Sequence, residues 1–213
     1  MKKNKIAVIG ATGKAGKYLL KELMQQDFQL KLLVRNPDKI QTQNSSVQII
    51  QGNVNSYDDV KLLLKDCDAV ISMLGLGIPN SEKNIFSTST QNILKAMKEF
   101  KIDRYLVITG LNVDTPFDQK GPKTKMGTDW MKANFPETTA DKQKEYEILS
   151  ESNVDWTLVR LPLIEQTDEK SAVEVNMEDC LGDKISATNL ALFLIEQLES
   201  KSYCKKAPFL SNK

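Results

Sequence analysis

Histidine is missing from the chain, and its absence excludes several kinds of chemistry. Without it there is no histidine general base, no Ser-His-Asp triad and no histidine-ligated metal. The three cysteines, Cys67, Cys180 and Cys204, are scattered, odd in number and without metal-ligand spacing. We therefore expect free thiols in a reducing cytoplasm and no bound metal. Acid or base work is left to Lys, Tyr, Thr, Ser, carboxylates or water.

Long apolar runs and an excess of one charge are also missing. No segment is apolar over the length of a membrane span, and Met1–Ile6 leads directly into a strand pattern, so we expect no signal peptide. The 29 basic and 28 acidic residues give a net charge of +1, which favours neither nucleic acid nor an anionic membrane as a partner. With 213 residues, 40% apolar content, no repeat and no linker, we expect one domain over residues 1–213.

A glycine-rich turn joins the first apolar strand pattern to the first helical pattern. Its residues are Gly10, Ala11, Thr12, Gly13, Lys14, Ala15 and Gly16. Gly10 lets the chain reverse, Gly13 leaves the backbone N–H groups open to a pyrophosphate, and Gly16 lets the helix pack closely. The helix N-terminus then favours an anion. The spacing differs from G-x-G-x-x-G, and a glycine-rich turn that binds nothing is the alternative interpretation.

Strand and helix patterns alternate along most of the chain. Strands are predicted at 6–9, 30–34, 47–50, 68–74, 105–109, 156–160 and 207–210, and helices at 17–23, 57–65, 86–100, 138–151 and 186–198. This alternation predicts an α/β fold, a doubly wound parallel sheet with helices on both faces. Two regions rich in Pro, Gly and charge, 110–137 and 161–184, are predicted as loops that form the acceptor site.

The residue that ends the second strand bears on the choice of cofactor. NAD enzymes of this build place an acidic residue there, against the ribose 2′-hydroxyl, whereas this chain has Arg35. A guanidinium pairs instead with the 2′-phosphate of NADP, and Lys39 is placed to add to the same site. A solvated surface arginine is the alternative. Asn53, after the third strand, is placed to bond the adenine edge or simply to favour a turn.

Four segments in this order resemble a known family. They are Gly10–Gly16, Leu33–Arg35, Gly52–Val54 and Val154–Pro162. Together they resemble an atypical short-chain dehydrogenase/reductase of the NmrA-like and flavin-reductase (biliverdin-IXβ reductase) type, which implies a single-domain Rossmann fold binding NAD(P)H. Residues 202–209 also resemble the tail of small bacterial NAD(P)H-binding members.

The resemblance implies a role for each matched position. The pyrophosphate would be held by Gly10, Thr12, Gly13, Lys14, Ala15 and Gly16, the 2′-phosphate by Arg35, and the adenine by Asn53 and Val54. The adenosine-side ribose would be lined by Leu74 and Gly75. The nicotinamide end would be approached by Thr109, Gly110, Pro162, Leu163 and Ile164.

The family's catalytic tyrosine and lysine, four residues apart, are not matched. Thr138 stands four residues before Lys142, and Tyr146 stands four residues after it, the wrong order. Thr109 and Lys142 therefore remain as the candidate catalytic residues, orienting the nicotinamide ribose and ring. An exposed helix lysine is the alternative for Lys142. Flavin-reductase relatives have a histidine where this chain has Leu163.

These observations predict an NADPH-dependent oxidoreductase that reduces a small planar acceptor such as a flavin or quinone. Hydride chemistry belongs to the cofactor, and such acceptors draw their proton from water, so a missing Tyr-Lys pair is tolerated. The alternative is a non-catalytic NADP(H)-binding redox sensor or regulator of the NmrA kind. We expect a cytoplasmic monomer or homodimer without nucleic-acid or membrane partners.

Overall fold

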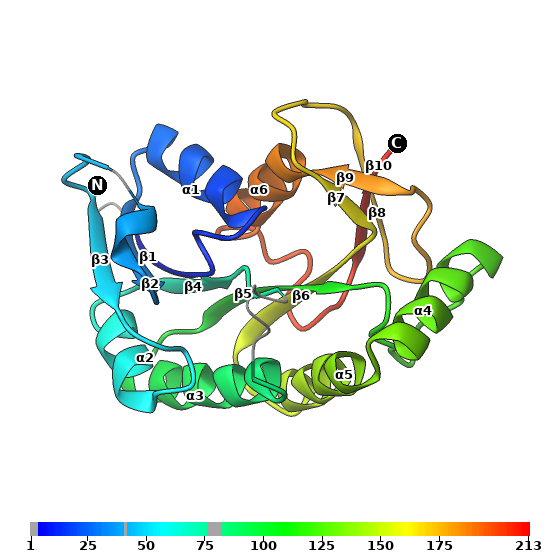
Figure 1. The fold of residues 1–213 in the computed structure, drawn as a ribbon, viewed down its shortest axis with the longest axis horizontal. Helices are drawn as coiled ribbons and strands as arrows, with labels where there is room; N and C mark the ends of the chain where they lie inside the picture. Colours follow the sequence, from blue (N-terminus) through cyan, green and yellow to red (C-terminus); the bar gives the residue numbers. More distant parts are fainter. Residues whose placement is uncertain (1–3, 41, 76–81) are drawn as a thin grey trace.

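The computed structural model describes residues 4–40, 42–75 and 82–213. Within these residues the main sheet has eight strands in the order β3-β2-β1-β4-β5-β6-β10-β8 (Figure 1). Their bounds are β1 Lys5–Ile9, β2 Gln29–Val34, β3 Val47–Gln51, β4 Ala69–Ser72, β5 Arg104–Gly110, β6 Asp155–Leu161, β8 Val173–Asn176 and β10 Phe209–Asn212. Neighbouring strands are parallel except for β8, which pairs antiparallel with β10. From β1 the chain adds β2 and β3 on one side and then crosses over to add β4, β5 and β6 on the other, so the order of the strands reverses between β1 and β4.

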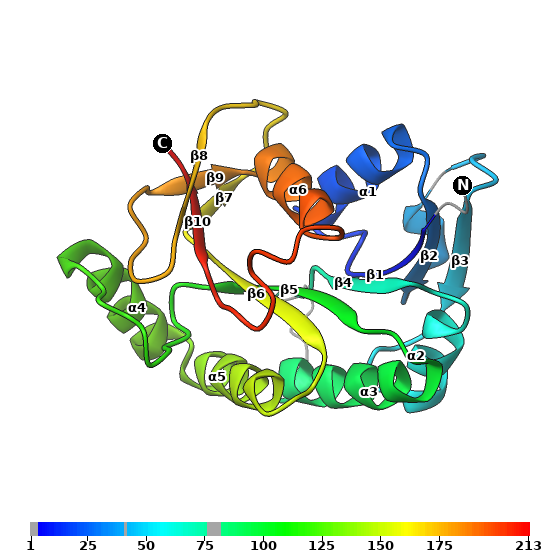
Figure 2. The same cartoon turned by 180° about the vertical axis from the view of Figure 1, so that it is seen from behind.

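Helices cover both faces of this sheet. Their bounds are α1 Gly16–Gln25, α2 Tyr57–Leu64, α3 Ile85–Phe100, α4 Pro122–Asn134, α5 Pro136–Ser150 and α6 Ala187–Glu196, with a short 3₁₀ helix, η1, at Pro37–Lys39. Helices α1 and α6 lie side by side on one face, and α2, α3 and α5 lie on the other, in both views (Figures 1 and 2). The predicted Rossmann-type α/β fold is therefore confirmed, with β8 as an antiparallel addition.

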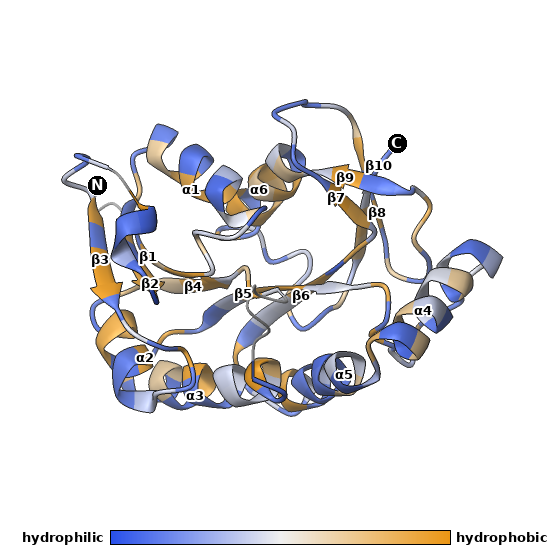
Figure 3. Ribbon diagram, in the orientation of Figure 1, coloured by the Kyte–Doolittle hydropathy of each residue, from blue (hydrophilic) through white to orange (hydrophobic). Residues whose placement is uncertain are grey.

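Burial on both faces explains the apolar strands. Val70 and Ile71 of β4 are adjacent in the chain, yet each is fully buried, one in each of the two hydrophobic clusters on the two sides of the sheet. The hydropathy colouring places apolar residues along the strands of the sheet (Figure 3). In the described part of the chain, no helix is long and apolar enough to cross a membrane.

Side-chain caps set the starts of three helices. The Oγ of Ser56 accepts a hydrogen bond from the backbone N–H of Asp59 at 3.3 Å, and the Oγ of Ser186 accepts one from that of Asn189 at 2.9 Å. The side chain of Asn36 likewise accepts from the N–H of Asp38, which opens η1. These contacts satisfy N–H groups that the helix itself leaves unpaired.

The prediction of a loop over residues 110–137 is wrong. Residues 122–134 form α4, and α5 begins at Pro136. Pro122 and Pro136 are each the first residue of their helix, a position that needs no backbone N–H and suits the fixed φ of proline. The prolines therefore begin helices here and do not interrupt one.

The region 161–184 is also more regular than predicted. It contains β7 (Leu163–Glu165), all of β8 and the start of β9 (Lys184–Ser186). Strands β7 and β9 pair in parallel as a separate two-stranded sheet. This pairing holds the segment that follows β6 beside the segment that precedes α6.

Candidate functional site

A cavity of about 630 Å³ lies at the carboxyl ends of β1, β2, β4 and β5. We call it the carboxyl-edge cavity. Its position, where the strand order reverses, is the usual ligand site of a doubly wound sheet, and its volume is typical of a small-molecule site. The lining residues predicted from the sequence are Gly10, Thr12, Gly13, Lys14, Ala15, Arg35, Lys39, Asn53, Val54, Leu74, Gly75 and Ile164. The predicted residues outside its lining are Gly16, Thr109, Gly110, Lys142, Pro162 and Leu163.

The glycine-rich turn has the geometry that the sequence predicts for it. Gly10 has a φ of +79°, and a Cβ there would lie 2.7 Å from the carbonyl oxygen of Met73. A Cβ on Gly16 would overlap the carbonyl oxygen of Gly10, so α1 can begin against the turn only with glycine. A Cβ on Gly13 would have one close neighbour, that same oxygen at 3.2 Å, and would otherwise point into open space. The turn therefore leaves room for a ligand at Gly13.

Two cations mark the end of the cavity beside β2. Arg35 follows the last residue of β2, and η1 places Lys39 on the same side of the cavity. Both side chains are exposed to solvent. Among the described lining residues Glu82 is the acidic one, and its carboxylate accepts a hydrogen bond from Asn55 Nδ2 at 2.6 Å. This end of the cavity therefore favours an anionic ligand.

Asn53 and Asn55 line the cavity between these cations and β4. The Oδ1 of Asn53 accepts from the N–H of Asn55 at 3.0 Å, so Asn53 does shape a turn. The carboxylate of Asp59 accepts from the N–H of Asn53 at 2.8 Å. The Oδ1 of Asn55 is buried and has no hydrogen-bond partner within the described residues. Asn55 therefore adds an acceptor that the sequence analysis missed.

The opposite end of the cavity is largely apolar. Its lining includes Ile85, Ile108 and Ile164, with Gln166 as a polar neighbour. Of these, only Ile164 is predicted from the sequence. Successive side chains of a strand point to opposite faces, and Ile108 belongs to the core on the α1 and α6 side. Thr109 therefore points to the face that α3 and α5 cover, away from Ile108, and its Oγ1 is buried without a partner in the described residues.

Lys142 is held inside the protein. Its Nζ donates to the carbonyl oxygen of Ile108 at 3.0 Å and to Glu145 Oε2 at 2.8 Å, and lies 3.9 Å from the ring centroid of Phe86. Glu145 is fully buried and also accepts from Thr90 Oγ1 at 2.9 Å. Burial raises the pKa of the Glu145 carboxyl, and the neighbouring Lys142 ammonium partly offsets this. The ammonium therefore ties α5 to the end of β5 behind the cavity wall.

Asp141, beside Lys142, makes a second buried contact between helices. Its carboxylate accepts hydrogen bonds from the backbone N–H groups of Phe86, at 2.8 Å, and Ser87, at 3.3 Å. These groups lie in the first turn of α3, where the helix leaves N–H groups unpaired and an anion is favoured. Asp141 therefore fixes the start of α3, next to Ile85 in the cavity lining.

Comparison with known proteins finds relatives at low sequence identity. Protein YwnB of Bacillus subtilis, described as uncharacterized, is 25% identical over 73% of this chain and 70% of its own length. TIC 62, a chloroplastic protein of Pisum sativum, is 26% identical over 95% of this chain, which spans 42% of that protein. A 40 kDa subunit of the mitochondrial NADH-ubiquinone oxidoreductase of Neurospora crassa is 23% identical over 62% of this chain and 38% of that subunit.

Solved structures share the fold at low sequence identity. The oxidoreductase ylbE of Lactococcus lactis has a TM-score of 0.82 at 19% identity, covering 98% of this chain and 91% of that one. A short-chain dehydrogenase/reductase of Veillonella parvula, in complex with NADP, has a TM-score of 0.77 at 16% identity, covering 98% and 94%. The model of a family described as NAD(P)H-binding matches residues 10–201. The chain therefore belongs to the NAD(P)H-binding family.

Proposed function

We propose that this protein is an NADPH-dependent oxidoreductase that reduces a small planar acceptor of the flavin or quinone class. The observation that carries the proposal is the polarity of the carboxyl-edge cavity. Arg35 and Lys39 lie at one end and Ile108 and Ile164 at the other, with the glycine-rich turn between them. NADP has the same order of parts: the adenosine with its 2′-phosphate is at one end, the pyrophosphate is in the middle and the nicotinamide ring is at the far end.

The turn at residues 10–16 is the proposed pyrophosphate site. Gly13 lacks the side chain that would enter the open space in front of the turn, and no side chain of the described residues caps α1. Backbone N–H groups at a helix start favour a phosphate. Asn53 and Asn55 offer amide groups to the adenine edge.

NADP is the proposed form of the cofactor because of Arg35. A guanidinium and the ammonium of Lys39 together favour a 2′-phosphate, and neither offers the carboxylate that a 2′-hydroxyl prefers. The Veillonella parvula neighbour in complex with NADP adds support at the level of the fold.

The chemistry at the apolar end favours an acceptor that takes its proton from water. When bound, NADPH supplies the hydride. Ile108 and Ile164 exclude water and offer no proton, and the ammonium of Lys142 is engaged by Glu145. A ketone needs a proton donor at its developing alkoxide, whereas quinones and flavins do not depend on a donor from the protein.

The same burial of Lys142 is the observation that favours a second candidate. A non-catalytic NADP(H) sensor needs a cofactor site and no catalytic lysine at the nicotinamide. Such a protein would bind NADPH and NADP⁺ with different affinities and reduce no acceptor.

Oxidation of NADPH, followed by its absorbance in the presence of quinones, flavins and simple ketones, separates these functions. The oxidoreductase proposal expects turnover of quinones or flavins and none of ketones. Tight NADPH binding without turnover of any acceptor would favour the sensor. Rapid ketone reduction would contradict both.

A further inference from the structure

We infer that α4 forms the acceptor-binding wall beside the carboxyl-edge cavity, that Met126 and Trp130 contact the acceptor, and that the acceptor is a quinone with an apolar substituent. The inference rests on the proposed function and names the substrate class for that site.

The exposed apolar side chains of α4 are the first observation. Met126 is 68% exposed and Trp130 is 58% exposed. They stand four residues apart and therefore lie on the same side of the helix. The buried residues of α4 are Thr124 and Thr128, so this helix turns small polar groups inward and large apolar groups outward. A surface helix normally has the opposite arrangement.

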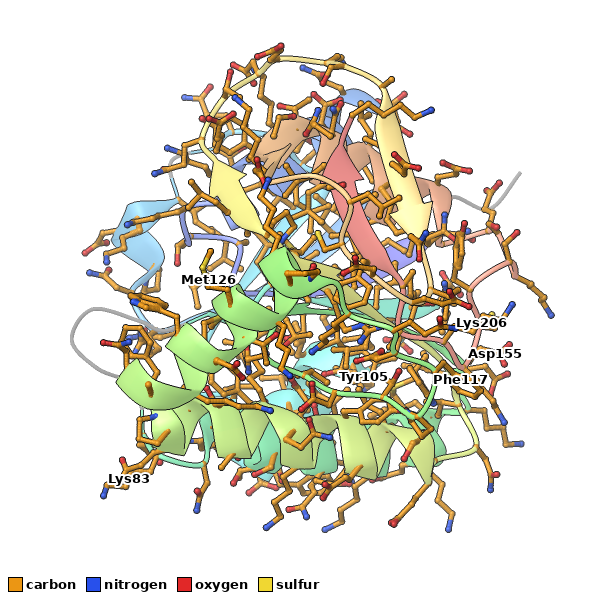
Figure 4. All side chains as sticks on the ribbon, turned by 90° about the vertical axis from the view of Figure 1, so that its right-hand side faces the viewer. Lys83, Tyr105, Phe117, Met126, Asp155 and Lys206 are labelled. Carbon is orange, nitrogen blue, oxygen red and sulfur yellow. The ribbon has the colours of Figure 1, made fainter. Side chains whose placement is uncertain are left out.

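The second observation is where this apolar side lies. In Figure 4, Met126 and Lys83 lie on the left, whereas Asp155 and Phe117 lie on the right. Asp155 is the first residue of β6, which marks the right as the amino edge of the sheet. Lys83 follows Glu82, a residue of the cavity lining. Met126 therefore projects on the side of the molecule where the cavity lies.

The helix is also anchored next to the cavity. A Cβ on Gly110, the last residue of β5, would lie 3.2 Å from the Cε of Met131 in α4. Ile108, two residues earlier in β5, lines the cavity. α4 is therefore anchored at the rim of the cavity, beside the end of β5.

Ion pairs and hydrogen bonds hold the opposite side of α4 and the segment that precedes it. Lys120 Nζ, 9% exposed, donates to Asp114 Oδ1 at 2.6 Å and to Thr128 Oγ1 of α4 at 3.3 Å. Asp118 pairs with the fully buried Arg160 of β6 at 2.6 Å. Lys132 of α4 pairs with Asp114 at 2.7 Å. Because polar contacts hold one side of α4 against the protein, its apolar side faces outward and is open to a ligand.

Arg160 is the residue through which this cluster reaches the sheet. Its guanidinium lies 3.6 Å from the ring centroid of Phe209 in β10 and donates to the carbonyl oxygens of Ala207 and Met177. It belongs to the sequence motif at 154–162 but lies outside the cavity lining. We assign it a positioning role for the segment that leads into α4.

The chemistry of this rim selects among planar acceptors. An indole offers a flat face for a conjugated ring, and a thioether packs against apolar groups of irregular shape. Exposed apolar patches of this kind mark ligand or partner sites. An alkyl substituent on a quinone covers the apolar side of α4 at Met126, whereas the polar phosphate tail of a flavin nucleotide does not. The reaction balances as quinone, NADPH and one proton from water giving hydroquinone and NADP⁺.

Paired serine substitutions test the wall. Met126→Ser and Trp130→Ser are compared with Phe117→Ser, which removes a side chain of equal exposure, 69%, on the opposite side of the molecule. For quinones with alkyl chains of increasing length, the first two variants are expected to raise KM about tenfold and to lose the dependence on chain length. The NADPH Kd stays unchanged, and Phe117→Ser behaves as wild type. Equal effects of all three variants, or a lower KM for FMN than for the alkyl quinones, would overturn the inference.

Tryptophan fluorescence tests contact without turnover. The chain has two tryptophans, and Trp156 is buried while Trp130 is exposed. An alkyl quinone added with NADP⁺ is expected to quench the emission saturably, and Trp130→Phe is expected to remove this quenching. Saturable quenching by a quinone that is never reduced would support the wall and contradict the proposed function. Quenching that persists in Trp130→Phe would overturn the wall and leave the proposed function standing.

Discussion

Lys142 Nζ lies 2.8 Å from Glu145 Oε2, and both side chains are almost completely buried. The pair lies between α3, α5 and β5, directly behind the lining residue Ile108. The candidate catalytic lysine that the sequence predicts therefore forms an ion pair with a buried carboxylate inside the protein.

The first prediction concerns this pair. Lys142→Met leaves the carboxylate of Glu145 buried without its cation, which is expected to cost about 3–5 kcal/mol of unfolding free energy. The NADPH Kd of the folded variant is expected to match that of wild type. Chemical denaturation and a binding titration measure the two quantities. Unchanged stability with a large rise in Kd would instead place Lys142 at the cofactor.

The second prediction is a pH dependence set by Glu145. Its pKa is raised in the folded state by burial, so its contribution to stability is present below about 4.3, the ordinary value for glutamate, and is lost as pH rises through the folded value. Glu145→Gln removes this titration. The difference in unfolding free energy between wild type and variant should therefore shift in favour of the variant as pH rises over that window. A pH-independent difference would contradict the assignment.

The third prediction concerns the glycine-rich turn. In Gly13→Val the added methyl groups enter the open space in front of the turn, so the protein is expected to fold and to lose most of its affinity for NADPH. Gly127→Ala is the control, because its Cβ makes only an ordinary contact, 3.4 Å from Leu111 Cδ1. Titration with NADPH, together with thermal unfolding, checks both. Full NADPH affinity in folded Gly13→Val would refute the proposed pyrophosphate site.

The fourth prediction concerns the cysteines. Burial raises the pKa of Cys67 and of Cys180 to about 11, so at pH 8 only about one molecule in a thousand carries each thiolate. Cys204 is the half-buried member of the three. Ellman's reagent is expected to modify one thiol quickly and two slowly, and Cys204→Ser should remove the fast phase. A fast phase that survives this substitution would contradict the burial pattern.

Local sequence signals predicted the parts of the site that depend on backbone geometry. Gly10 and Gly16 are needed because any Cβ would overlap backbone, and such a requirement is visible as spacing in the sequence. Ser56 and Ser186 start helices through contacts three residues away. Arg35 was found because the end of β2 follows directly from an apolar pattern.

The sequence does not predict features that depend on the direction in which a side chain points in the folded protein. The sequence gives no sign that Lys142 turns toward Glu145, since an exposed pair three residues apart looks the same. Thr109 and Ile108 are neighbours in β5 and point to opposite faces of the sheet. Which of the two lines the cavity depends on which helices cover each face, and the sequence alone does not fix this. Pro122 and Pro136 are typical of loops and equally of the first position of a helix, and the sequence alone does not separate the two.

Binding of NADPH and NADH to wild type and to Arg35→Ala, measured by calorimetry at one ionic strength, tests the cofactor assignment most directly. A charge-assisted contact to the 2′-phosphate is worth about 1.5–3 kcal/mol, which corresponds to roughly tenfold to 150-fold tighter binding of NADPH than of NADH. Wild type is expected to show this preference, and Arg35→Ala is expected to lose it while its affinity for NADH stays the same. An equal loss of affinity for both cofactors, or no loss for either, would contradict the assignment of Arg35 to the 2′-phosphate and of NADPH to this site.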